Sequence, residues 1–293
     1  MLQKLVKPQW LKIKLTTTDS FINVRNTIKH FNLHSVCEEA HCPNISECWN
    51  GGTATFMLMG DTCTRACKFC AVKTGNQMKK LDANEPKKLA QALAEIKLFD
   101  YVVLTSVNRD DLEDGGASHF AECINEIKKA YPEIIVEVLI PDFKGDVEAL
   151  KKIIEARPEV IAHNIETVER LQKKVRDVRA NYKQSLAVLE NVKKINLKIY
   201  TKSSIMLGLG ETDEEVVQSM KDLRAINVDI LTLGQYLRPT DWHIPISSFI
   251  PPAKFDYFKQ KALEIGFLFC ASGPFIRSSY RAGELFIKNV LNR

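Results

Sequence analysis

The sequence predicts an α/β fold: a partial (β/α)6 barrel that stays open. Six short apolar runs rich in β-branched residues, starting at Thr55, alternate with segments in which apolar residues recur at helical spacing. Strands that alternate with helices pair in parallel through right-handed crossovers, and a count of six favours an open barrel over the closed eight-stranded form. Polar residues directly follow several of the runs, where the functional residues of such barrels lie.

The length of each apolar run and the spacing of its apolar residues predict the strands and helices. Strands are expected at residues 55–59, 101–106, 134–140, 159–164, 197–207 and 228–234, with 267–270 as a candidate for a last strand. Helices are expected at residues 20–30, 85–97, 117–130, 146–156, 168–174, 182–195, 213–226 and 251–264. Asp19 or Ser20 is expected to cap the first helix. These elements divide the chain into an N-terminal extension (1–54), the barrel (55–270) and a C-terminal extension (271–293).

Composition and charge exclude some classes of function. The 293 residues are 45% apolar and 26% charged, as in ordinary globular proteins. The 41 basic and 36 acidic residues leave a net charge of +5, which is too small to indicate nucleic acid binding. That excess suits an acidic protein partner or an anionic small ligand, and equally a solvated surface without a partner. No run approaches the ~20 apolar residues of a membrane span, so no membrane partner is expected.

The cysteines indicate metal binding in a reducing, cytoplasmic environment. Six of the eight fall within residues 37–70, a distribution that suits a metal site better than a disulfide framework. The N-terminal segment has neither the apolar core of a secretory signal nor the Ser and Arg enrichment of a transit peptide.

The second group of cysteines predicts a metal centre with an open position. Cys63, Cys67 and Cys70 follow the first strand with three and then two residues between them. Three thiolates leave one position unfilled in a tetrahedral zinc site or at one iron of a four-iron cluster. A zinc site that takes its fourth ligand from elsewhere is the alternative. The spacing, with Phe69 before the last cysteine, resembles that of the radical S-adenosylmethionine (SAM) enzymes. The resemblance implies a [4Fe-4S] cluster whose fourth iron binds the amino and carboxylate groups of SAM.

The first group of cysteines predicts a second iron–sulfur cluster. Cys37, Cys42 and Cys48 have four and then five residues between them, unlike the close pairs of zinc ribbons. Turn residues at 43–44, inside the triplet, and at 51–52, after it, predict a loop-rich segment rather than a long helix. His41 lies inside this triplet and is a candidate ligand. A loop residue without a ligand role is the favoured interpretation, because the three thiolates already supply enough soft ligands for the metal.

Polar residues after the strands are the candidates for binding SAM. An amide and a carboxylate suit ribose hydroxyls, and a carboxylate also suits an ammonium group. Loop caps and salt bridges are the alternatives for each. The candidates are Asn108, Asn164, Glu166, Lys202 and Gln235.

Motifs along the whole chain resemble those of the lipoyl synthase family. They are EEAHCPNISECW, TSVNRDDLEDGG, HNIETV, MLGLGE, QYLRPT and RSSY. The resemblance implies that the first triplet holds an auxiliary [4Fe-4S] cluster and that a serine of RSSY completes it. Ser279 is preferred to Ser278 as the fourth ligand of this cluster. Cys270 is a weaker candidate, because its sequence pattern predicts a buried strand residue. A serine oxygen binds iron more weakly than a thiolate does, which suits a cluster that is consumed.

The resemblance further implies the reaction: insertion of two sulfur atoms at carbons six and eight of a protein-bound octanoyl-lysine. Unactivated C–H bonds are not acidic, so hydrogen must be abstracted by a radical derived from SAM. The auxiliary cluster donates the sulfur. The implied partners are an octanoylated lipoyl carrier domain, from a 2-oxoacid dehydrogenase or the glycine-cleavage carrier protein, a ferredoxin or flavodoxin reductant, and cluster-assembly proteins.

Two alternative functions fit parts of this sequence. One is a different sulfur-inserting or methylthiolating radical enzyme, against which the position of the first triplet and the RSSY motif argue. The other is an iron–sulfur carrier or electron-transfer protein, which would need neither an open iron nor polar strand ends.

Overall fold

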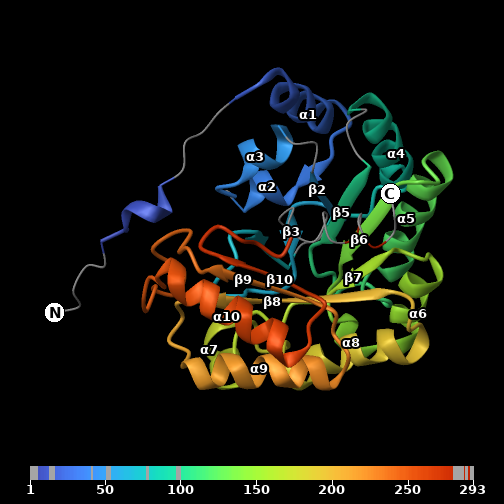
Figure 1. Cartoon of the computed structure of the whole chain (residues 1–293). Coiled ribbons are helices and arrows are strands. Elements are labelled where there is room, and N and C mark those ends of the chain that lie inside the picture. Colours follow the sequence, from blue (N-terminus) through green and yellow to red (C-terminus); the bar gives the residue numbers. More distant parts are fainter. Residues whose placement is uncertain are drawn as a thin grey trace.

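A single mixed sheet organises the chain (Figure 1). The computed structural model describes residues 6–12, 17–40, 42–50, 54–76, 79–96, 100–279, 287 and 290. Within these residues the sheet has eight strands, of which β1 is antiparallel to β2 and the other seven run parallel. In spatial order they are β1 (His34–Ser35), β2 (Thr55–Leu58), β5 (Tyr101–Ser106), β6 (Ile135–Leu139), β7 (Val160–Ala162), β8 (Tyr200–Leu207), β9 (Ile230–Gln235) and β10 (Phe269–Gly273).

The six predicted strands are confirmed as β2 and β5 to β9, and the candidate last strand is confirmed as β10. β10 pairs in parallel with β9 and runs on to Gly273, across the predicted boundary at residue 270. Among the described strands no ladder joins β1 to β10, so the barrel is open, as predicted. Because the seven strands are parallel, the loops that follow them gather at one edge of the sheet.

The helices flank the sheet, and most coincide with the predicted ranges (Figure 1). Strands form where apolar residues stand in short continuous runs, and helices form where apolar residues recur about every 3.6 positions and so share one face. The two patterns alternate along the chain, and the elements alternate with them. The helices that follow the strands are α4 (Glu85–Ile96), α5 (Ala117–Ala130), α6 (Val147–Glu155), α8 (Tyr182–Ile195), α9 (Asp213–Ala225) and α10 (Pro252–Ile265). Shorter turns are η1 (Gln9–Leu11), η2 (Phe143–Gly145), η3 (Glu169–Leu171) and α7 (Gln172–Val175).

The N-terminal extension packs against the barrel beside β2 (Figure 1). It contains α1 (Asp19–His30) and two short helices, α2 (Val36–Glu39) and α3 (Ile45–Asn50), in the segment predicted to be loop-rich. The predicted cap of α1 is wrong: the side chain of Thr18, not of Asp19 or Ser20, accepts the capping hydrogen bond from the Phe21 N–H. Trp49 of α3 is fully buried, with its ring centroid 5.0 Å from that of Phe21.

The core extends through both halves of the barrel. One buried cluster joins the extension to β2, β5, β6 and the helices that cover them, and a second joins β8, β9, α9 and α10. Cys123 and Cys270 belong to these clusters, as their sequence patterns predicted. Across the described ranges, no helix has both the length and the apolarity to cross a bilayer.

Candidate active site

One cavity of about 580 Å³ opens at the carboxyl ends of the strands and brings the two cysteine groups together. It is bounded by the loops after β5, β6, β7 and β9, by the N-terminal extension and by the residues that follow β10. Predicted site residues that line it are Cys37, Cys42, Cys63, Cys67, Cys70, Asn108, Asn164, Glu166, Gln235, Ser278 and Ser279. Segments more than 200 residues apart in the chain therefore face a common volume.

The second cysteine group lies in a loop that backbone hydrogen bonds hold against the barrel. The loop starts after β2 and includes the short parallel pair β3 (Thr62–Cys63) and β4 (Lys73–Thr74). The Sγ atom of Cys63 accepts hydrogen bonds from the N–H groups of Arg65, at 3.4 Å, and Asn108, at 3.3 Å. The Sγ atom of Cys67 accepts one from Asp177, at 3.3 Å. At Cys67 this bond acts to lower the pKa of the thiol, against the larger effect of burial.

Arg65, between the first two cysteines of this loop, ties it to two strand ends. Its guanidinium donates to both oxygens of Asp142 at 2.7 Å and to those of Asp110 at 2.9 and 3.0 Å, and its side chain is 4% exposed. Burial opposes ionisation of Asp110 and Asp142, but the hydrogen bonds from Arg65 outweigh it and lower the pKa of both carboxyls. The network is therefore fully charged and paired around neutral pH.

Asp177 and His243 hold the rest of the loop. Asp177 Oδ2 accepts a hydrogen bond of 2.8 Å from the Ala66 N–H, and bonds from Arg179 lower the pKa of the Asp177 carboxyl. His243 Nε2 lies 2.9 Å from the carbonyl oxygen of Cys70, which can only accept, so this nitrogen donates. Contacts from four different barrel loops thus orient the cysteines.

Burial keeps four of these six thiols neutral near pH 7. It raises the pKa of Cys37 and Cys67 to about 11 and that of Cys70 to about 12, and it also raises the pKa of Cys42. A metal cation in the cavity reverses this preference, because a coordinating thiol loses its proton outright. Among the eight cysteines, all of which lie in described residues, there is no disulfide. The donor set thus fits soft metal centres at both groups.

The first cysteine group faces the other side of the cavity, next to the C-terminal segment. Cys37 is the second residue of α2, and the Ser35 side chain accepts a hydrogen bond from its N–H. Cys48 lies buried in α3 without lining the cavity. The Asn44 side chain donates a 2.6 Å hydrogen bond to the carbonyl of Phe275, which links this segment to the residues after β10. Ser278 and Ser279 both reach the cavity. His41 and the last residue of the RSSY motif lie outside the described residues.

Asn164 and Glu166 form the most unusual polar pair in the cavity. β7 ends at Ala162, so both residues lie in the loop beyond it, and Glu166 has a φ of +67°. Asn164 Nδ2 donates to Glu166 Oε1 at 3.1 Å, and in the described structure the buried Asn164 Oδ1 has no hydrogen-bond partner. Burial raises the pKa of Glu166, against the opposing charge of Arg176. A buried carboxylate beside an unsatisfied amide oxygen suits a ligand that donates hydrogen bonds, such as an ammonium or a hydroxyl group.

The other three candidates for binding SAM lie in different surroundings. Asn108 lines the cavity beside Cys63. Gln235 also lines it, but its amide group is engaged by backbone groups, donating to carbonyls and accepting from the Ile250 N–H at 2.8 Å. Lys202 does not line the cavity: its ammonium lies inside the barrel, 2.6 Å from Glu137 Oε1. The structure therefore brings four of the five candidates together and separates Lys202 from them.

Sequence reasoning missed the residues that anchor the cysteine loop. Asp142, Asp177 and His243 stand in loops of ordinary polar composition, and only the folded chain brings them to the cysteines. Arg65 could be singled out from the sequence. It lies between two ligands of the motif, and its long charged side chain needs acceptors near them.

Comparisons with known proteins agree with this geometry. A family model described as the radical SAM superfamily matches residues 57–223, and one described as the N-terminal domain of lipoyl synthase matches residues 2–42. The lipoyl synthase of Anaeromyxobacter sp. (strain Fw109-5) is 55% identical, over 97% of this chain and 96% of the relative. That of Halobacterium salinarum is 57% identical, over 97% and 92%. The apicoplast lipoyl synthase of Plasmodium falciparum (isolate 3D7) is 55% identical, over 98% and 69%.

The chain belongs to the lipoyl synthase family of radical SAM enzymes. Solved structures share its fold. Methylornithine synthase (PylB) has a TM-score of 0.56 at 13% identity, over 75% of this chain and 71% of that one. The hydrogenase maturase HydG from Carboxydothermus hydrogenoformans has a TM-score of 0.57 at 12% identity, over 94% and 83%.

Membership of the lipoyl synthase family confirms the predicted class of protein. The chain is an enzyme of the radical SAM sulfurtransferase type, and its family implies a [4Fe-4S] cluster and SAM. The partly open parallel sheet is the fold expected of that family.

Proposed function

We propose that this enzyme inserts two sulfur atoms at carbons six and eight of an octanoyl-lysine on a lipoyl carrier domain. The observation that carries the proposal is the shared cavity, which Cys37 and Cys42 of the first group, all three cysteines of the second, four of the five SAM candidates and Ser278–Ser279 line. Sulfur insertion needs a hydrogen-abstracting centre and a sulfur source within reach of the same carbon chain, and one cavity supplies that proximity.

Cys63, Cys67 and Cys70 are proposed to hold the radical-generating [4Fe-4S] cluster. When bound, that cluster supplies the electron that cleaves SAM into methionine and a 5′-deoxyadenosyl radical. The residues of this chain contribute position: Arg65, Asp177 and the loop of His243 keep the thiolates in place. Three thiolates leave one iron for SAM.

Asn164 and Glu166 are proposed to bind SAM, with Asn108 as a further contact. The unpartnered Asn164 Oδ1 and the buried Glu166 carboxylate support this assignment, because both accept hydrogen bonds. We assign Gln235 to the same wall as a residue that shapes it through its backbone contacts. Lys202 is assigned to the barrel interior through its pairing with Glu137.

Cys37, Cys42 and Cys48 are proposed to hold the auxiliary [4Fe-4S] cluster, with Ser279 as its fourth ligand. That cluster supplies the sulfur when it is bound. Both serines of the motif lie at the cavity, and Ser279 is preferred on the resemblance of the RSSY motif. A serine oxygen is a weaker ligand for iron than a thiolate, so Ser279 would hold its iron less tightly than the three cysteines hold theirs.

The cavity wall also suits an aliphatic chain. Apolar side chains from four separate segments reach it, which provides a surface that excludes water from a carbon radical. They include Met57, Leu139, Ile140, Met206 and Ile276. An octanoyl chain on a lysine arm has the length and apolar character to enter such a cavity.

The proposed partners follow from the reaction. They are an octanoylated carrier domain, a ferredoxin or flavodoxin that supplies electrons, and proteins that rebuild the auxiliary cluster. We propose a reducing compartment, such as the cytoplasm, because both sites need free thiolates.

An anaerobic turnover tests the proposal. The reconstituted enzyme is mixed with dithionite, SAM and an octanoylated carrier domain, and the carrier is analysed by mass spectrometry. We expect two sulfur atoms per carrier, two molecules of 5′-deoxyadenosine and about eight iron atoms per chain before turnover, the sum of two four-iron clusters. About four iron atoms, or a carrier that gains no sulfur, would contradict the proposal, and absence of 5′-deoxyadenosine would indicate an iron–sulfur carrier instead.

A further inference from the structure

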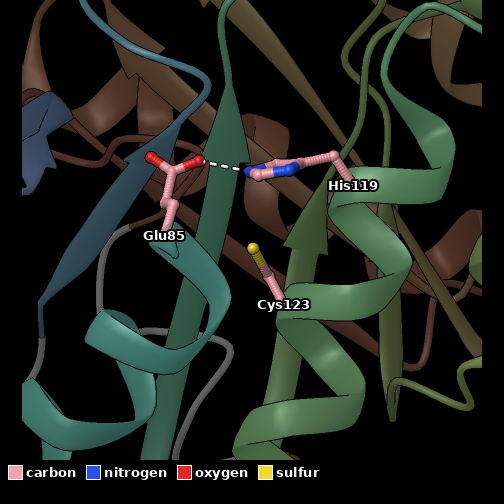
Figure 2. Close-up of side chains that lie close together, drawn as sticks. All are labelled: Glu85, His119 and Cys123. Carbon is pink, nitrogen blue, oxygen red and sulfur yellow. Dashed lines mark hydrogen bonds and ion pairs between the residues drawn. The ribbon is translucent and has the colours of Figure 1, made fainter. Parts of the chain in front are cut away.

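A buried group of three polar side chains lies outside the cavity, between α4 and α5. Glu85 is the first residue of α4, and His119 and Cys123 lie one turn apart on α5 (Figure 2). Glu85 Oε2 lies 2.5 Å from His119 Nε2, and the Sγ atom of Cys123 points into the same gap, with the ligand atoms of all three within 4.8 Å of one another. None of these side chains is more than 8% exposed, and the proposed reaction uses none of them.

The distances favour a hydrogen-bonded pair over a metal site. Two ligands on one tetrahedral zinc ion, each about 2.1 Å from the metal, lie about 3.4 Å apart. The Glu85 and His119 atoms are much closer than that, at hydrogen-bond distance. Burial raises the pKa of Cys123 well above its ordinary value, so its thiol stays neutral and packs as an apolar group.

The Glu85 carboxylate has a second contact, with the start of the cysteine loop. The N–H of Met59, the residue after β2, donates to Glu85 Oε1 at 3.2 Å and to Oε2 at 3.0 Å. Met59 has a φ of +68°, which is strained for a residue with a side chain, and Gly60 follows at +93°. The chain can hold two such residues in succession only where its surroundings determine their conformation.

The start of α5 contacts the same turn from another side. A Cβ atom on Gly116, which precedes α5, would lie 2.2 Å from the Met59 sulfur, so only glycine permits this approach. Met59 is therefore held at its backbone by Glu85 and at its side chain by Gly116. Glu85 belongs to α4 and Gly116 directly precedes α5, and the hydrogen bond between Glu85 and His119 ties these two helices together at the turn.

We propose that Glu85 and His119 are positioning residues that hold the Met59–Gly60 turn and thereby place Cys63 for its iron. The inference rests on the proposed cluster at Cys63, Cys67 and Cys70. Cys63 comes only four residues after Met59, so a change in this turn moves its sulfur relative to the other two thiolates. Cys63 is also held from the other side, by the pairing of β3 with β4 and by the Asn108 N–H at its sulfur, so the turn is its support on the N-terminal side.

Release of iron from this one cluster tests the proposal. All variants carry Cys37→Ala, so that iron is held by the Cys63 group alone, and iron loss to a chelator is followed under anaerobic conditions. Glu85→Ala leaves the strained Met59 N–H without its acceptor and is expected to release iron about ten-fold faster. Glu85→Gln keeps an oxygen for that N–H and is expected to stay within about two-fold of the parent.

Asp229→Ala is the matched control. Asp229 also accepts a backbone N–H bond, of 2.7 Å from Thr201, and pairs with Lys193, but it lies at the opposite, amino-terminal ends of β8 and β9. Its loss is expected to lower the melting temperature as Glu85→Ala does while leaving iron release unchanged. The comparison separates a positioning effect on Cys63 from a general loss of stability.

Three results would overturn the proposal. The first is an equal rate of iron loss in Glu85→Ala and the parent. The second is an equal acceleration in Asp229→Ala. The third is zinc or iron retained by a chain that lacks all six cluster cysteines and lost on Cys123→Ser, which would make the group a metal site. If the Cys37→Ala parent formed no cluster, the two sites would be coupled and this inference would fail. Failure of the proposed function would show separately, as absence of 5′-deoxyadenosine when the reconstituted unmodified chain is mixed with dithionite and SAM.

Discussion

The two cysteine sites share a cavity but are built differently. The Cys63 group lies in a loop that Arg65 ties to two strand ends and that backbone hydrogen bonds join to the barrel at Asn108 and Asp177. The Cys37 group lies in two short helices of the N-terminal extension and the loop between them, linked to the C-terminal segment by the hydrogen bond from Asn44. A rigid support suits a site that must work repeatedly, and a looser one suits a cluster that is dismantled and rebuilt. The following changes test this contrast.

The largest expected effect comes from the rigid site. Cys67→Ala removes one of the three thiolates that hold the radical-generating cluster, so 5′-deoxyadenosine formation is expected to fall below detection. Chromatography of the nucleoside product measures this. The auxiliary cluster should remain, at about four iron atoms per chain. Loss of all iron would show that the two sites do not assemble independently.

Loss of the other site should separate two activities. Cys37→Ala removes a ligand of the sulfur-donating cluster but leaves the SAM site intact. No sulfur should reach the octanoyl chain, whereas 5′-deoxyadenosine should still form at a rate within about ten-fold of the parent enzyme. Mass spectrometry of the carrier and chromatography of the nucleoside give the two readouts. Simultaneous loss of both products would indicate that the sites are coupled.

Arg65→Met should show how much the rigid anchor contributes. It leaves the buried carboxylates of Asp110 and Asp142 without their cation, which costs about 3–5 kcal/mol of unfolding free energy. Denaturant unfolding of the metal-free chain measures this. The control is Arg170→Met, which breaks an ion pair with Glu215 whose arginine is 55% exposed, and is expected to cost at most about 1 kcal/mol. Equal effects of the two changes would contradict the anchoring role.

Acidification should lower the free energy of unfolding through His163, in the loop after β7. Burial, with the nearby charge of Arg176, lowers the pKa of His163 to about 4, so the folded chain holds this ring neutral, between the Ile140 carbonyl and Ser185. The pKa of the ring in the unfolded chain is about 6.5, so between pH 6.5 and pH 4 the unfolded chain binds a proton that the folded chain does not. Stability should therefore fall by about 3 kcal/mol from pH 6.5 to pH 4. His163→Gln should flatten this part of the pH profile, and an unchanged profile would assign the slope to other groups.

The smallest expected effect concerns the serines at the looser site. Ser279→Ala removes the proposed fourth ligand of the auxiliary cluster and should slow sulfur insertion by about ten-fold, the effect of losing one weak ligand. Ser278→Ala is its matched control, because both serines line the cavity. It should leave the rate within about two-fold. The reverse order of effects would assign the ligand to Ser278.

Much of this protein can be predicted from local sequence. Regular period and turn residues mark the strands and helices, so α5 and α8 begin and end where predicted. The spacing of Cys63, Cys67 and Cys70 identifies a three-thiolate centre because the ligands lie within one loop. Local signals failed at the cap of α1, where three polar residues in succession, Thr18 to Ser20, offer equivalent cap oxygens.

Tertiary structure alone decided which distant side chains meet. Nothing in the sequence indicates that Asp142 would face Arg65, that Glu85 would accept from Met59, or that Lys202 would pair with Glu137 and lie away from the cavity. The physical reason is that local patterns record periodicity and spacing within a few turns of chain. The partner of a buried charge is instead set by how the strands align, which depends on the packing of the whole barrel.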